Sequence, residues 1–111
     1  MIIEELHGKA REIFDDFNAL HFGGALAPIP IDFEEISDWK GALYYKPSLR
    51  MVLALPFLRQ SGDEGLRQVI LHEMIHYFFH FKEIKDTSSP LLGHSVRFRE
   101  MANKVGLTLL R

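Results

Sequence analysis

The stretch from Val69 to Phe81 constrains the fold of this chain more than any other segment. Apolar residues would cover most of the circumference of a helix here: Val69, Ile70, Leu71, Met74, Ile75, Phe78 and Phe79. A helix that is apolar on nearly all sides is buried, so the rest of the 111-residue chain must pack around it. Polar residues interrupt the run before it reaches the length of about 20 apolar residues that a membrane span needs.

The start of this central helix is indicated by Ser61, because Glu64 follows it three residues later. In such a capping box the serine side chain accepts a hydrogen bond from the third amide of the helix, while the glutamate side chain reaches back to the backbone N–H of the serine. We therefore predict a helix from Ser61 to about Glu83.

A second, amphipathic helix is predicted at the beginning of the chain, from Ile2 to Leu20. Apolar residues recur there at steps of three and four: Ile2, Leu6, Ala10, Ile13, Phe14, Phe17 and Leu20. Gly23 and Gly24 should end this helix, since glycine adopts the left-handed conformation found at helix ends.

Between these helices the sequence changes to short runs of apolar, β-branched and aromatic residues. We interpret three of them as strands, at Pro30–Phe33, Ala42–Tyr45 and Arg50–Leu55, with a hairpin turn near residues 46–48. Residues Lys85–Gly93 read as a loop, and a last helix is expected from Val96 to Val105.

This order predicts an α+β fold in a single domain spanning residues 1–111. It would consist of an N-terminal helix, a small three-stranded antiparallel or mixed sheet, a central helix and a C-terminal helix. The opening residues resemble neither a signal peptide nor a membrane anchor, so we expect a soluble, cytoplasmic protein.

Composition removes several kinds of site. The chain has no cysteine, which excludes disulfides, thiolate zinc sites and thiol nucleophiles. Its formal net charge of −2, with mixed signs along the chain, gives no broad attraction to nucleic acid. Histidine and carboxylate ligands remain available.

The central helix carries the motif His72-Glu73-Met74-Ile75-His76. Residues four apart lie above one another on a helix, so His72 and His76 can bind one zinc ion together. Glu73 then lies beside the metal, where it can take a proton from zinc-bound water. Three polar groups in the most apolar helix would be costly if buried without partners, and a metal would satisfy them. The pattern indicates hydrolysis of peptide bonds.

A catalytic zinc of this kind needs a third protein ligand. His80 lies on the same helical row, but about 6 Å further along the axis, too far for all three histidines to reach one ion without bending the helix. Glu100 and Asp86 are carboxylate alternatives. A surface salt bridge is the simpler interpretation of Glu100, and a position in a loop is the simpler interpretation of Asp86. His94 follows a loop that can swing it over the metal, and we favour it as the third ligand.

The sequence resembles the SprT-like zincins, a family of metalloproteases that includes the Spartan proteases. The resemblance runs along nearly the whole chain and rests on Phe17-Asn18, Phe22-Gly23-Gly24, Leu26, Gly41, Tyr44, His72-Glu73-Met74-Ile75-His76-Tyr77, Gly93-His94 and Phe98. It implies a zincin fold, His72, His76 and His94 as zinc ligands, and Glu73 as the general base. Ser95 departs from the glycine that the family usually has after its third histidine.

The expected function is that of a zinc metalloendopeptidase acting on unfolded or exposed protein segments. Such a substrate would extend along residues 41–45 as an added strand, and Tyr44 or Tyr45 could stabilise the oxyanion. The alternative is a zinc-binding interaction module without activity, against which the intact Glu73 argues.

The resemblance also implies DNA-associated protein substrates, but the charge pattern gives this no support. The zinc ribbon and the DNA-binding tail of many family members are not found in the sequence. Arg97, Arg99 and Lys104 form only a modest basic cluster.

Overall fold

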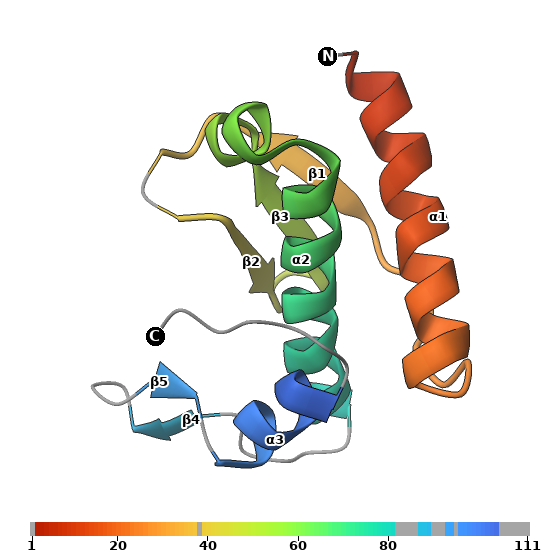
Figure 1. The fold of residues 1–111 in the computed structure, drawn as a ribbon, viewed down its shortest axis with the longest axis vertical. Helices are drawn as coiled ribbons and strands as arrows, with labels where there is room; N and C mark the ends of the chain where they lie inside the picture. Colours follow the sequence, from red (N-terminus) through yellow and green to blue (C-terminus); the bar gives the residue numbers. More distant parts are fainter. Residues whose placement is uncertain (1, 38, 82–86, 90–92, 95, 105–111) are drawn as a thin grey trace.

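The computed structural model describes residues 2–37, 39–81, 87–89, 93–94 and 96–104. Its elements are α1 (Ile3–His21), β1 (Ile31–Glu34), β2 (Gly41–Tyr44), β3 (Arg50–Ala54), α2 (Leu55–Phe81), β4 (Thr87–Ser89), β5 (Gly93–His94) and α3 (Val96–Lys104). Figure 1 shows α2 at the centre of the molecule, with α1 and the sheet beside it. The predicted α+β class, with its N-terminal, central and C-terminal helices, is confirmed.

Helix α1 agrees with its prediction in position and in its buried face. Leu6, Ala10, Phe14 and Phe17 are buried, and their spacing puts them on one side of the helix. The helix ends as expected, because Gly23 and Gly24 have φ values of 61° and 74°. In this conformation the amide of Gly24 donates a 2.8 Å hydrogen bond to the carbonyl oxygen of Asn18.

The three-stranded sheet is mixed and has the order β1-β3-β2. Strand β3 pairs parallel with β1, aligning Ile31 with Met51, and antiparallel with β2, aligning Tyr44 with Arg50. The strand predictions were correct to within one residue at each end.

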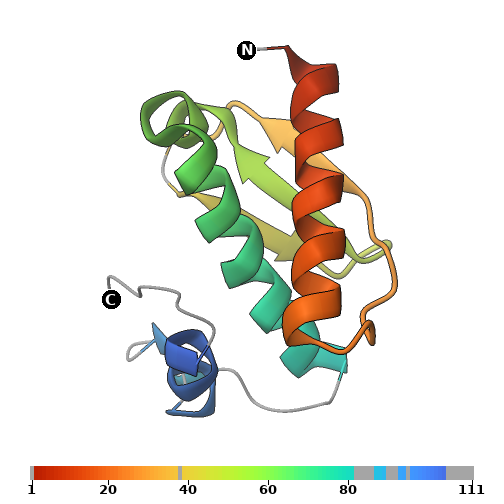
Figure 2. The same ribbon diagram turned by 45° about the vertical axis from the view of Figure 1, so that its right-hand side comes forward.

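Both long helices cover the same face of this sheet, as Figure 2 shows. Helix α1 packs over β1, whereas α2 packs over β2 and β3. Ile31, Met51 and Leu53 lie on the covered face and join the helices in one core. The sheet therefore supports the length of α2 that carries the histidine motif.

The predicted start of the central helix at Ser61 agrees with the second segment of α2, which follows an interruption at Gly62, where φ is 66° and ψ is −152°. A first helical segment, which begins at Leu55 directly after β3, was not predicted. The hydroxyl of Ser61 donates to the carbonyl of Phe57 at 2.8 Å, so it closes the first helical segment. Pro56 was the overlooked signal, since proline is favoured in the first turn of a helix.

The predicted loop at residues 85–93 was wrong in part, because Thr87–Ser89 forms strand β4 and pairs antiparallel with β5. Helix α3 has the predicted start at Val96 and packs against α2. Figure 1 shows this small C-terminal unit beside the end of α2 that follows the motif. In the described part of the chain, no helix is long and apolar enough to cross a membrane.

Candidate active site

The motif residues lie on the second segment of α2, between its buried apolar neighbours. Met74 and Ile75 are fully buried, whereas His72 and His76 are only half-buried. The helix therefore turns its hydrophobic side into the core and keeps both imidazoles at the boundary of the core. A ligand can reach that boundary without opening the core.

The two imidazoles point to a common place. Nε2 of His72 lies 3.2 Å from Nε2 of His76, and the ring centroids are 5.0 Å apart. Two nitrogens that each lie about 2.0–2.1 Å from a tetrahedral zinc are about 3.3 Å from each other. The pair thus has the spacing of two zinc ligands, as the i and i+4 positions predict, and the residues present fit the metal.

Glu73 is the one buried charged residue among the described side chains, with 6% of its surface exposed. It follows His72 directly in the sequence, about 100° further around the helix. Burying a carboxylate is costly unless it is paired or bound to a partner. The role of Glu73 as general base stays a prediction.

No third histidine, aspartate or glutamate among the described side chains completes a metal-binding group with His72 and His76. His80 and Glu100 are both described and both exposed, so neither of them joins the pair in this structure. The side chain of His94 and the whole of Asp86 lie outside the described residues, as do Ser95 and the side chain of Phe98.

The backbone of His94 is described, and its position is informative. It is the last residue of β5 and lies two residues before the start of α3, which packs against α2. The chain therefore returns to the motif helix at this point. The assignment of His94 as third ligand stays a prediction.

The motif helix is anchored just after its second histidine. The hydroxyl of Tyr77, a buried residue, donates a 2.9 Å hydrogen bond to the carbonyl oxygen of Ala27. Burial raises the pKa of Tyr77, so the phenol keeps its proton at neutral pH. In the sequence Tyr77 stands out only as part of the motif, because no local pattern indicates a hydrogen-bond partner 50 residues away.

The loop that carries Ala27 is held in turn by Asn18. Its side-chain amide donates to the carbonyl of Leu26 at 2.8 Å and accepts from the amide of Leu26 at 3.1 Å. These bonds explain the asparagine at position 18, because its side-chain amide can donate to and accept from the backbone of Leu26 at the same time. They shape the loop onto which the motif helix is fastened.

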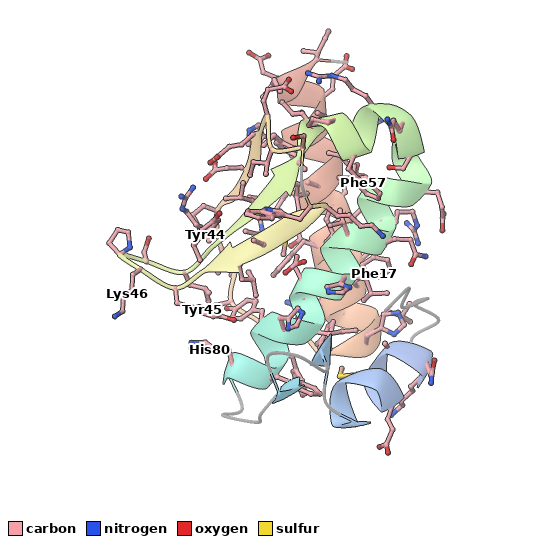
Figure 3. The ribbon with its side chains drawn as sticks, turned by 90° about the vertical axis from the view of Figure 1, so that its left-hand side faces the viewer. Phe17, Tyr44, Tyr45, Lys46, Phe57 and His80 are labelled. Carbon is pink, nitrogen blue, oxygen red and sulfur yellow. The ribbon has the colours of Figure 1, made fainter. Side chains whose placement is uncertain are left out.

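Strand β2 lies alongside the motif helix, and residues near its two ends contact α2. Gly41 adjoins Val69, three residues before His72. At the other end the rings of Tyr45 and His80 are 4.4 Å apart, and Figure 3 shows this pair beneath the hairpin that carries Lys46. His80 thus contacts an aromatic ring four residues after His76.

The two tyrosines considered for oxyanion stabilisation lie in different places. Side chains alternate along a strand, so Tyr44 lies on the sheet face opposite Gly41 and away from α2. The guanidinium of Arg50 lies 4.9 Å from its ring centre on that face. Tyr45, which contacts α2 through His80, is the better placed of the two.

Comparison with known proteins agrees with this architecture. A search of curated proteins finds no match for the chain. The model of the SprT-like family matches residues 10–109, a span that begins in α1 and includes the sheet, the motif helix and His94. This family is associated with the zincin-like metalloprotease fold. Because the match covers most of the chain, the protein belongs to the SprT-like family.

Proposed function

We propose that this protein is a zinc-dependent metalloendopeptidase that cleaves exposed or unfolded protein segments. The observation that carries the proposal is the 3.2 Å spacing between the Nε2 atoms of His72 and His76. The buried Glu73 follows His72 directly in the sequence. Membership of the SprT-like family supports the same class of chemistry.

His72 and His76 would hold the metal, with His94 as the third ligand. When bound, zinc supplies a Lewis acid that polarises the peptide carbonyl and lowers the pKa of water to about 7. Glu73 accepts the proton of the attacking water and later delivers it to the leaving amine. Its low exposure keeps bulk water away from the carboxylate during this transfer.

The free edge of β2 is suited to hold the substrate. Among the described strands, β2 pairs only with β3. The amide of Ala54 donates to the carbonyl of Lys40 at 2.9 Å, and antiparallel bonding alternates from residue to residue. Gly41 and Leu43 therefore direct their backbone N–H and C=O groups away from β3.

An extended peptide can pair with those groups as an additional strand. Because the bonds go to backbone atoms, such pairing demands an extended chain more than a particular sequence. A folded protein rarely offers one, whereas an unfolded or protruding segment does. We therefore assign exposed polypeptide as the substrate class.

The test compares the wild-type protein with Glu73→Gln after zinc has been added to both. We expect the wild type to cleave casein, and the variant to bind zinc normally but lose activity about 10²- to 10⁴-fold, because the amide keeps the shape without the basicity. Zinc binding is measured by competition with a chelating dye, and cleavage by release of labelled peptides.

Equal activity of the two proteins would remove Glu73 from its role. A wild type that binds zinc and cleaves neither casein nor itself would instead favour the alternative, a zinc-binding interaction module.

A further inference from the structure

Gly41 lies at the closest approach between the free edge strand and the motif helix. A Cβ atom at this position would lie 2.9 Å from Cγ2 of Val69, 3.0 Å from Cδ2 of Leu53 and 3.1 Å from the carbonyl oxygen of Val52. The first of these distances is shorter than real Cβ contacts, and the other two are tighter than nine in ten of them. Any other residue here would require the strand, the helix or the side chains between them to shift.

The reason for the glycine is space and not backbone conformation. The glycines with positive φ in the described residues are Gly23, Gly24 and Gly62, so Gly41 has a backbone that alanine could also adopt. Val69 is buried and branched at Cβ, which restricts its side chain to one main rotamer in a helix. Turning Val69 aside would therefore put it in an unfavourable rotamer within the core.

The contact also has a particular place along the helix. Val69 precedes His72 by three residues, about one helical turn, so the two side chains lie on neighbouring turns. With Tyr45 and His80 touching at the other end, the strand is docked on both sides of the motif. The distance between strand and helix is set at these two places.

We infer that Gly41 is a positioning residue, which sets how far a substrate on the edge of β2 lies from Glu73 and the metal ligands. This inference rests on the proposed function. The backbone of Gly41 would bind substrate, while its missing side chain fixes the depth of the strand against α2. Misplacing reacting groups by about 1 Å can cost about 100-fold in rate.

The test is Gly41→Ala, with Val69→Ala as a second change that makes room for the added methyl group. We expect Gly41→Ala to lower kcat about tenfold and to change KM less, since the edge keeps its backbone groups but holds the substrate further from the general base. Zinc affinity should stay within about twofold, because both histidines remain on an intact helix. The double variant should recover most of the lost kcat.

Gly8→Ala is the matched control. Gly8 lies on α1, where an added Cβ meets no atom within 4 Å, so its activity should equal that of the wild type. Circular dichroism confirms that each variant is folded. If Gly41→Ala does not fold, the double variant, in which the main clash is removed, takes its place and must be active.

Wild-type kinetics in Gly41→Ala, or a loss that Val69→Ala does not relieve, would overturn the inference while leaving the proposed function intact. A parallel loss of zinc affinity would overturn it too, because the glycine would then serve the metal site itself. An inactive wild type would contradict the proposed function and the inference with it.

Discussion

The two histidines of the motif show how much a single spacing along a helix determines. Their separation by four positions requires that they share one face of a helix, and the 3.2 Å between their Nε2 atoms agrees with that requirement. The third ligand is different in kind. It must come from another element, and its position depends on how the chain folds back, which no local spacing specifies.

Zinc titration of three alanine variants separates the candidate ligands. We expect His94→Ala to weaken zinc binding at least about 100-fold, because a catalytic site of this type needs three protein ligands. His80→Ala and Glu100→Ala should remain within about threefold of the wild type, since neither residue joins His72 and His76 in the structure. The affinity is measured by competition with a chelator of known strength.

Both controls replace exposed side chains, so they also reveal any general effect of substitution near the site. A large loss in Glu100→Ala together with a small loss in His94→Ala would contradict the assignment.

At the scale of the elements, the accuracy of prediction depended on whether the deciding interaction was local. Helix α1 has a regular apolar spacing and two glycines at its end, and each of its bounds was predicted to within one residue. Strand β4 was missed because Thr87–Ser89 is short and polar, a composition typical of turns. Its pairing with β5 depends on contacts between residues that are four to seven positions apart in the sequence.

The candidate site divides in the same way. Two of the proposed ligands and the proposed general base follow from one helical motif. Two other contacts join segments that are more than 25 residues apart: the hydrogen bond from Tyr77 to Ala27 and the packing of Gly41 against Val69. These contacts form only when the helices and strands have packed together, so the sequence does not reveal them.

The hydrogen bond from Tyr77 on α2 to Ala27, in the loop before β1, predicts that the stability of the folded protein decreases at alkaline pH. Burial raises the pKa of Tyr77 in the folded protein above its value of about 10 in the unfolded chain. The unfolded chain therefore loses the proton first, so stability is complete below about pH 10 and falls as pH rises through the folded pKa. Tyr77→Phe should lower the free energy of unfolding at pH 7 by about 0.5–1.5 kcal/mol.

Above pH 10 the wild type should lose more stability than Tyr77→Phe does. The difference between their free energies of unfolding should therefore become smaller. Urea unfolding at pH 7 and at alkaline pH measures this. Tyr45→Phe, which leaves Tyr77 in place, should keep the wild-type dependence. An unchanged gap at both pH values would show that the Tyr77 proton does not contribute.

In the part of the chain that the structure describes, several basic side chains face carboxylates. Arg50 lies 3.5 Å from Asp32 and 3.6 Å from Glu34 on the outer face of the sheet. Arg59 pairs with Glu35, and Lys9 lies 3.2 Å from Asp63. The side chains of Arg97 and Arg99, which the sequence placed in a small basic cluster, lie outside the described residues.

This arrangement leads us to expect that the isolated protein binds single-stranded DNA weakly or not at all at physiological salt. Phosphate contacts need clustered cations, whereas these cations are paired within a molecule of net charge −2. Fluorescence anisotropy with labelled single- and double-stranded oligonucleotides, at low and at physiological salt, measures the affinity. Tight binding that persists at the higher salt would contradict the expectation, and recruitment to DNA would then need no partner.

The direct junction between β3 and α2 has a consequence for the order in which this molecule assembles. Ala54 ends the central strand and Leu55 begins the helix, with no residue between them. Before Arg50 emerges during synthesis, β1 and β2 lack the strand that both of them pair with, because they are not neighbours in the sheet. When β3 is inserted, it completes the sheet of β1, β2 and β3. The helix that bears the histidines begins at the next residue, so its start is positioned at the same time. The histidines of the proposed metal site therefore follow, in the order of synthesis, the strand that completes this sheet.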